Sequence, residues 1–132
     1  MAIQLSVALR NAKADQFEAE VGASGTLEIR TGAQPADCAS ANSGTVLSTI
    51  SLPADFMNAA ANGVVAINNG PWTDASADAT GTAGHFRIFN GATCHMQGSA
   101  GTSGTDMILT SADLTAGEPF EITLFTVTEG NA

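Results

Sequence analysis

The chain has 132 residues, a mass of 13.3 kDa and a formal net charge of −9, which arises from 13 acidic and four basic side chains. This length predicts a single domain. Alanine, threonine and glycine supply 24, 15 and 14 residues, so large aromatic anchors will be few in the core. Four scattered cations cannot neutralise a row of phosphates, and the composition argues against direct binding of nucleic acid.

The first ten residues contain neither a basic leader nor an apolar run of signal-peptide length, and no stretch of 18 apolar residues follows them. We therefore expect a protein that is made in the cytosol, stays there unless something carries it out, and has no membrane partner. The two cysteines are Cys38 and Cys94. In a reducing compartment we expect both as free thiols, with a structural disulfide as the alternative.

Two helices are predicted. Ser6 is a suitable N-cap for the first, and Gly22 supplies its C-terminal stop. A second, shorter helix of one or two turns is predicted over residues 54–62, because Pro53 can open it and Gly63 can end it. The apolar stripe of the first helix spans about 80° on a helical wheel and comprises Val7, Ala14, Phe17 and Val21.

Most of the remaining chain shows the period-2 alternation of half-buried strands. This alternation covers residues 27–30 and 46–52, and residues 64–67 form a shorter strand. Between the first two strands, residues 31–44 are rich in small and turn-forming side chains and predict a long surface loop. Residues 73–84 predict a second extended loop.

The strongest local signal lies in residues 85–97, where two strand-like runs flank the dipeptide Asn90-Gly91. As a two-residue loop, Asn-Gly is typical of a type I′ hairpin. With this loop, Phe89 pairs with Ala92, and every later pair in the hairpin follows from that register.

A last pair of strands, residues 106–110 and 119–128, encloses a turn at residues 115–117. Within the final strand the apolar residues change from even-numbered to odd-numbered positions, which lie on opposite faces of a strand. Either a bulge shifts the register of this strand or both of its faces are covered. One face carries Phe120, Ile122 and Leu124, and the other carries Phe125 and Val127.

Short strands at turn-rich spacing after one amphipathic helix predict a mainly β protein, an antiparallel β-sandwich or jelly-roll-like barrel with an N-terminal α-helix. Within a single domain, 1–132, residues 1–22 form the N-terminal segment and helix and residues 26–132 form the β-sandwich. A doubly wound α/β fold would need helices between the strands, which the sequence does not supply.

No motif for catalysis or for binding a cofactor occurs, so we expect neither an enzyme nor a bound cofactor. In the predicted hairpin register, His85 and His95 point to opposite faces of the sheet and cannot share a metal ion unless a bulge intervenes. Cys94 and His85 share a face only as diagonal neighbours, which does not favour a catalytic dyad.

Asp74 and Asp78 are weak candidates for a cation site, because hard cations prefer oxygen ligands in loops of this kind. Their spacing does not fit an EF-hand. The alternative is that these short polar side chains cap turns.

Several segments together resemble a family of small virion proteins of tailed bacteriophages and prophages, described as head decoration, cement or tail-fibre-associated proteins. The resemblance covers essentially the whole chain, and residues 74–98 are its most specific part. It is carried by LSVALRNAKADQFEAEVG, TLEIRTGAQPADC, SLPADF, DASADATGTAGHFRIFNGATCHMQG and TAGEPFEITLFTVTEGNA.

The resemblance implies a non-enzymatic structural protein that decorates and stabilises the capsid, and it brings no catalytic residues. Its partners would be the major capsid protein, or tail proteins, and copies of itself. It would be made in the host bacterial cytoplasm and end in the virion. One alternative is a tail- or tail-fibre-associated protein. Another is a carbohydrate-binding β-sandwich module, for which Trp72 is the one credible aromatic platform.

The sequence contains more apolar residues than one core face can bury, and the surplus marks a candidate interface. On this hypothesis the N-terminal segment and the loop that follows Asp74 contact the shell or a neighbouring copy, and two arginines pair with carboxylates across the contact. The alternative is that the helix covers the second face of the sheet. The candidate interface residues are Ile3, Leu5, Arg10, Asp74, Asp78, Arg87, Phe125 and Val127, and Leu9 also lies off the helix stripe.

Overall fold

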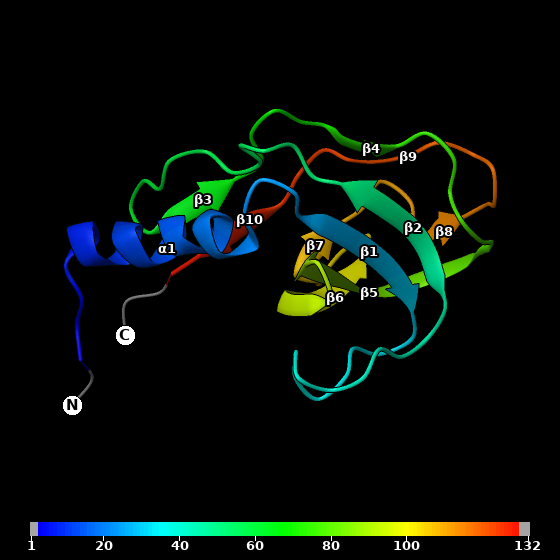
Figure 1. Ribbon diagram of the computed structural model, residues 1–132, viewed down its shortest axis with the longest axis horizontal. Helices are drawn as coiled ribbons and strands as arrows, with labels where there is room; N and C mark the ends of the chain where they lie inside the picture. Colours follow the sequence, from blue (N-terminus) through cyan, green and yellow to red (C-terminus); the bar gives the residue numbers. More distant parts are fainter. Residues whose placement is uncertain (1–2, 130–132) are drawn as a thin grey trace.

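The computed structural model describes residues 3–129 and contains one helix followed by short strands (Figure 1). The predicted mainly β, sandwich-like fold with an N-terminal helix is confirmed, but the sheets do not close into a barrel. In chain order the elements are α1 (Val7–Val21), β1 (Thr26–Thr31), β2 (Val46–Ser51), β3 (Val64–Ala66), β4 (Trp72–Asp74), β5 (Gly81–Asn90), β6 (Thr93–Gly101), β7 (Met107–Ile108), β8 (Asp113–Leu114), β9 (Phe120–Ile122) and β10 (Thr126–Thr128).

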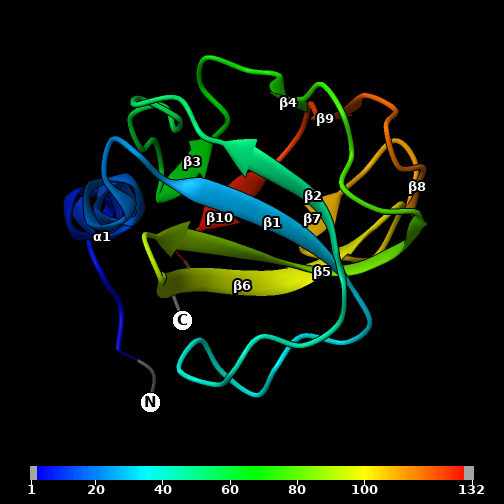
Figure 2. The same ribbon diagram turned by 45° about the vertical axis from the view of Figure 1, so that its right-hand side comes forward.

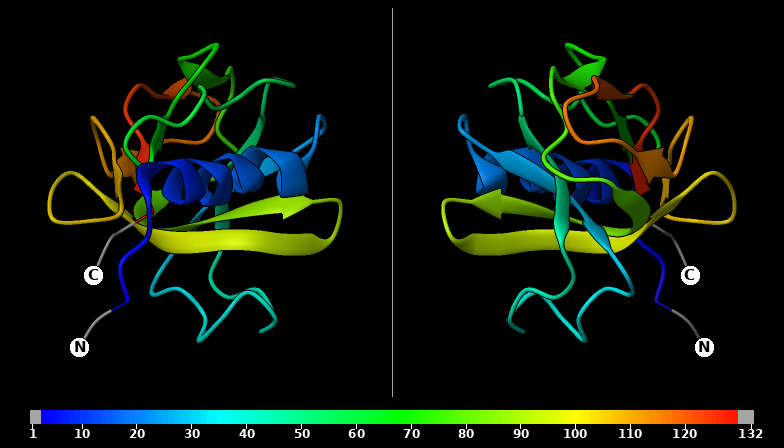
Figure 3. Two further views of the ribbon diagram at one scale, coloured as in Figure 1. Left: turned by 90° about the vertical axis from the view of Figure 1, so that its left-hand side faces the viewer. Right: turned by 90° about the vertical axis from the view of Figure 1, so that its right-hand side faces the viewer.

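The main sheet has the strand order β2-β1-β5-β6-β7, and β8 pairs with the beginning of β5. Its pairs are antiparallel except for β6 and β7, which run parallel at this edge. Two small antiparallel sheets, β3 with β10 and β4 with β9, lie on one side of the main sheet (Figure 2). The loop between β1 and β2 lies on the other side (Figure 3).

Four aromatic rings join the main sheet to the small sheets. Trp72 on β4 contacts Phe56 and Phe125, with ring centroids 5.9 and 6.1 Å apart. Phe125 in turn meets Phe86 on β5 edge to face at 5.3 Å. Most of the few aromatic residues are therefore gathered at one place, where small side chains alone could not fill the space between the layers.

The predicted register of the β5–β6 hairpin is wrong. Asn90 pairs with Thr93, so the loop consists of Gly91 and Ala92, with Gly91 at a φ of 61°. A register shift next to Phe89 then leaves His95 as an extra residue in β6. A bulge of this kind is not visible in a local turn signal, because it depends on which side chains the rest of the fold buries.

The predicted strand over residues 119–128 is divided between two sheets. Its first part, β9, pairs with β4, and its second part, β10, pairs with β3. Ile122 and Phe125 are both buried, because the chain crosses from one sheet to the other between them. This crossing explains the change of parity and shows that Phe125 is a core residue, so its assignment to an interface is wrong.

The predicted second helix over residues 54–62 is also wrong. This segment is irregular, with isolated β-bridges from Met57 to Ile67 and from Ala61 to Val64. In a helix, the backbone N–H groups of this segment would bond to carbonyl oxygens of the same helix. Three of them instead donate hydrogen bonds to side chains of α1. Tertiary contacts with α1 thus outweigh the weak helical preference of this segment.

Replacing Phe125 by alanine should lower the free energy of unfolding by about 3–5 kcal/mol, because the buried ring contacts two aromatic partners and its removal leaves a cavity. The neighbouring Leu124 is 57% exposed and provides a matched control. Leu124→Ala should change stability by no more than about 0.5 kcal/mol. Urea denaturation of both variants tests this, and equal losses would contradict the assigned core.

Candidate interaction surface

Helix α1 begins and ends where the sequence predicts. The Ser6 hydroxyl oxygen accepts a hydrogen bond from the Leu9 backbone N–H at 3.1 Å, which satisfies one of the free donors of the first turn. Gly22, at a φ of 80°, ends the helix, and its N–H donates to the Glu18 carbonyl oxygen at 2.9 Å. The helix is therefore defined by local sequence at both ends.

The beginning of α1 extends past the sheets (Figure 1). Apolar side chains in this part of the chain are exposed. Ala14 and Val21 are buried, whereas Val7 and Leu9 are each 48% exposed and Ile3 is 82% exposed. Ile3, Val7 and Leu9 are together called the N-terminal apolar surface below, although Val7 and Leu9 lie about 200° apart around the helix axis. Ile3 thus lies on the surface, as the interface hypothesis requires, and Leu5 beside it is half-buried.

Polar side chains, in addition to the apolar stripe, hold α1 against the rest of the molecule. Three of them, spaced four and three residues apart on the helix, accept backbone N–H groups of the irregular segment after β2. Sequence reasoning missed this row, although its spacing places the side chains on one helix face. The bonds run from Gly63 N to Asn11 Oδ1 at 2.7 Å, from Ala60 N to Asp15 Oδ1 at 2.8 Å, and from Met57 N to Glu18 Oε2 at 2.5 Å.

Two cations lie on the same part of the helix. Arg10 donates to the carbonyl oxygens of Glu129, at 3.0 Å, and of Asn62, at 2.9 Å. The Lys13 ammonium group lies 2.6 Å from the Glu129 carboxylate, and its side chain remains 48% exposed. Arg10 is thus used inside the chain, but its acceptors are neutral carbonyls that do not cancel its charge.

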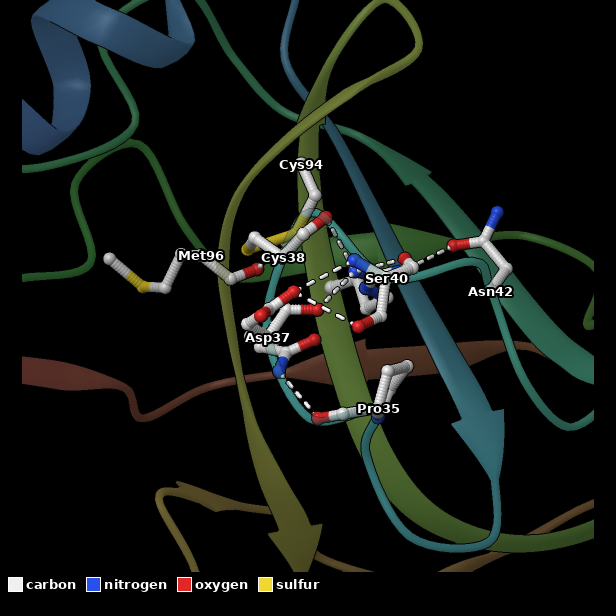
Figure 4. Close-up of a disulfide and its surroundings, with 9 residues drawn as sticks. Pro35, Asp37, Cys38, Ser40, Asn42, Cys94 and Met96 are labelled. Carbon is white, nitrogen blue, oxygen red and sulfur yellow. Dashed lines mark hydrogen bonds between the residues drawn. A yellow bond between two sulfur atoms is a disulfide. The ribbon is translucent and has the colours of Figure 1, made fainter.

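Arg87 is only 1% exposed, so its assignment to an interface is wrong. Its guanidinium group holds the loop between β1 and β2 by donating hydrogen bonds to several oxygen atoms of that loop. Figure 4 labels the loop residues that accept them. The donated bonds go to the carbonyl oxygens of Asp37 (3.2 Å), Cys38 (2.9 Å) and Ser40 (3.2 Å) and to the side-chain oxygen of Asn42. A buried arginine requires such acceptors, because an unpaired donor without water is costly.

Cys38 and Cys94 form a disulfide between this loop and β6, with Cα atoms 5.2 Å apart, so the expectation of free thiols is wrong (Figure 4). The sequence could not bring the two cysteines together, because their proximity requires the loop to fold back over β5. The same loop is held by Gln97, which donates to the Pro35 carbonyl oxygen at 2.8 Å, and by the His85 ring nitrogen Nδ1, 2.9 Å from the Gly32 carbonyl oxygen.

These contacts decide the chemistry of the predicted cysteine and histidine residues. The sulfur of Cys94 is bonded to Cys38 and has no thiolate to offer as a nucleophile. His85 is fully buried against backbone, and His95 is exposed in the bulge of β6. The arrangement thus gives this loop a structural role.

The two aspartates proposed as cation ligands hold strands and turns together. Asp74 accepts hydrogen bonds from the Ser48 hydroxyl at 2.7 Å and from the Ser76 N–H at 3.0 Å. Asp78 accepts one from the Thr49 hydroxyl at 2.8 Å. Within residues 3–129, no three or more His, Cys, Asp or Glu side chains are grouped so that they could hold a metal ion.

Two further side chains are less exposed than the sequence hypotheses require. Val127 is half-buried and packs against the core, so it offers little surface to a partner. Trp72 is buried, with 1% of its surface exposed, and cannot present its ring to a sugar. The carbohydrate-binding interpretation loses the one aromatic platform on which it depended.

Comparisons with protein-family models, curated proteins and solved structures found no match to this chain. Among residues 3–129, no helix has the length and apolar character needed to cross a membrane.

The native protein should react with a thiol reagent only after reduction, because both cysteines are bonded to each other. Reduction should then lower the free energy of unfolding by about 2–4 kcal/mol, since the bond closes a long loop in the unfolded chain. A thiol titration of the unfolded, unreduced protein tests the bond directly. Detection of two free thiols in that sample would contradict it.

Arg87→Lys should release the loop, because a single ammonium group cannot reach the four oxygens that the guanidinium fork serves. We expect a loss of about 2–4 kcal/mol in unfolding free energy and faster amide hydrogen exchange at Ser40. Lys13→Met, which removes an exposed cation, is the control and should leave exchange in the loop unchanged. Unaltered exchange at Ser40 in Arg87→Lys would contradict the assigned role.

Proposed function

We propose that this chain is a non-enzymatic virion structural protein that adds to an assembled capsid and stabilises it. The observation that carries the proposal is the N-terminal apolar surface, which lies at the extended end of α1 on an otherwise acidic molecule. Exposed apolar side chains gathered at one end are typical of a surface that another protein covers. The sequence resemblance to small phage virion proteins supports the same conclusion.

The charge distribution suits such a role. A net charge of −9 keeps separate copies apart in solution and favours attachment to a basic region of a shell protein. Each contact can be modest, because many copies on one particle supply avidity. The partners would be the major capsid protein and further copies of this chain, and the protein would pass from the host cytoplasm into the virion.

The interior supports a structural role as well. The disulfide and the buried Arg87 make the loop between β1 and β2 a fixed part of the fold. His85, the one buried histidine, binds a backbone carbonyl oxygen and has no nucleophilic side chain as its partner. These side chains contribute to the stability of the fold, and a decoration protein needs stability and not catalytic turnover of a substrate.

Deleting Met1 to Leu5 should leave a folded protein that adds to particles lacking it about 10- to 100-fold more weakly. Burial of one exposed isoleucine is worth about 1.5–3 kcal/mol, and Ile3 is the most exposed large apolar residue within residues 3–129. Cosedimentation with purified heads, and separately with tails, measures the addition.

The matched control is Leu124→Glu, which alters an exposed apolar residue outside the N-terminal apolar surface and should add like the unmodified protein. Undiminished addition of the truncated protein would show that attachment occurs elsewhere. Cosedimentation of the unmodified protein with tails and not with heads would identify a tail component and overturn the capsid assignment.

A further inference from the structure

We propose that the disulfide between Cys38 and Cys94 is a reversible lock on a loop that hydrogen bonds already hold in place. The bond then opens and closes with the redox state of the surroundings while the loop stays docked on the sheet. The loop comprises residues 32–45, between β1 and β2. The inference goes beyond the proposed function and does not rest on it. It follows from the contacts of the loop, the placement of the two cysteines and their exposure.

Hydrogen bonds that involve neither sulfur atom hold the loop against the main sheet. The Arg87 guanidinium group donates to backbone carbonyl oxygens on both sides of the Cys38 side chain and to the side chain of Asn42. Bonds donated by a charged group are stronger than bonds between neutral groups. Three further contacts are spread along the loop and join Gln97 Nε2 to the Pro35 carbonyl oxygen at 2.8 Å, His85 Nδ1 to that of Gly32 at 2.9 Å, and Arg30 Nη1 to that of Ser43 at 3.3 Å.

The sheet residues that make these contacts are positioned independently of the loop. Arg87 and His85 lie on β5, which is paired with β1 on one side and with β6 on the other. Gln97 lies on β6, directly opposite Arg87. Opening of the disulfide changes none of these strand pairs, so every donor to the loop stays where it is.

The same contacts place the two cysteines side by side, as Figure 4 shows. Cys94 is fixed in β6, opposite Phe89. Cys38 lies in a turn closed by the Asp37 carboxylate, which accepts the Ser40 N–H at 2.8 Å and the Ser40 hydroxyl at 3.0 Å. The Cα atoms of the cysteines are 5.2 Å apart, although 56 positions separate them in sequence. In a flexible chain such thiols meet at an effective concentration on the order of millimolar or lower, which a docked loop raises.

Neither cysteine is fully buried, so small thiols and disulfides can reach the bond. Closure is an exchange with a low-molecular-weight disulfide, for which glutathione disulfide is the probe. One cysteine thiolate attacks a sulfur of glutathione disulfide, displaces one glutathione thiolate and forms a mixed disulfide. The other cysteine thiolate attacks the protein sulfur of the mixed disulfide and displaces the second. The protein loses two electrons and two protons, which the two released glutathione molecules carry.

Docking of the loop and closure of the bond are coupled, and the coupling is reciprocal. A closed disulfide keeps Cys38 over β6, and a docked loop keeps the two thiols together. The equilibrium constant for oxidation by glutathione disulfide therefore reports how firmly the reduced loop is docked. Weakening the contacts of Arg87 or Gln97 should lower this constant.

Redox titration in glutathione buffers tests the coupling, with the oxidised fraction measured by mass spectrometry after alkylation of free thiols. Arg87→Lys should lower the equilibrium constant at least about tenfold, because the reduced loop is released. Gln97→Ala, which removes only the bond to Pro35, should lower it about two- to tenfold. Arg10→Lys is the matched control, since Arg10 also donates to two carbonyl oxygens but lies on α1, and the constant should stay within about twofold.

Nuclear magnetic resonance of the reduced protein tests docking directly and does not depend on the folding of Arg87→Lys. The guanidinium N–H signals of Arg87 should stay in slow exchange with water after reduction, and also in a variant with Cys38→Ser and Cys94→Ser. Loss of these signals in both samples would show that the disulfide alone holds the loop and would overturn the inference. An unchanged equilibrium constant in Arg87→Lys would also overturn it, and Gln97→Ala decides the same point if Arg87→Lys does not fold.

Discussion

The burial of β5 on both faces is the constraint on which the other layers depend. Phe86 and Ile88 face the aromatic core, whereas His85 and Arg87 face the loop between β1 and β2. An arginine in such a place can be accommodated only if acceptors surround it, and the loop supplies them as backbone carbonyl oxygens. The disulfide from Cys38 to Cys94 holds the same loop that Arg87 holds against the sheet.

This use of cations inside the fold determines the outside of the molecule. With Arg87 and Arg30 buried, the remaining cationic side chains are Arg10 and Lys13 on α1, a helix that also carries Asp15, Glu18 and Glu20. Lys13 is paired with the Glu129 carboxylate. The same helix carries the N-terminal apolar surface past the end of the sheets.

The predictions from sequence succeeded where structure is decided locally. Ser6 and Gly22 bound α1 because capping depends on a few adjacent residues, and Ile3 was recognised as exposed surface. The errors concern contacts between distant segments. A bulge in β6 altered the hairpin register, and a change of sheet after Ile122 buried Phe125.

An electron-microscopy map of particles that carry this protein tests the central claim most directly. The account predicts that the end of the molecule with Ile3 and Val7 is covered by another protein, with many copies arranged around symmetry axes of the shell. A map in which this end projects into solvent, while some other face makes the contact, would contradict it.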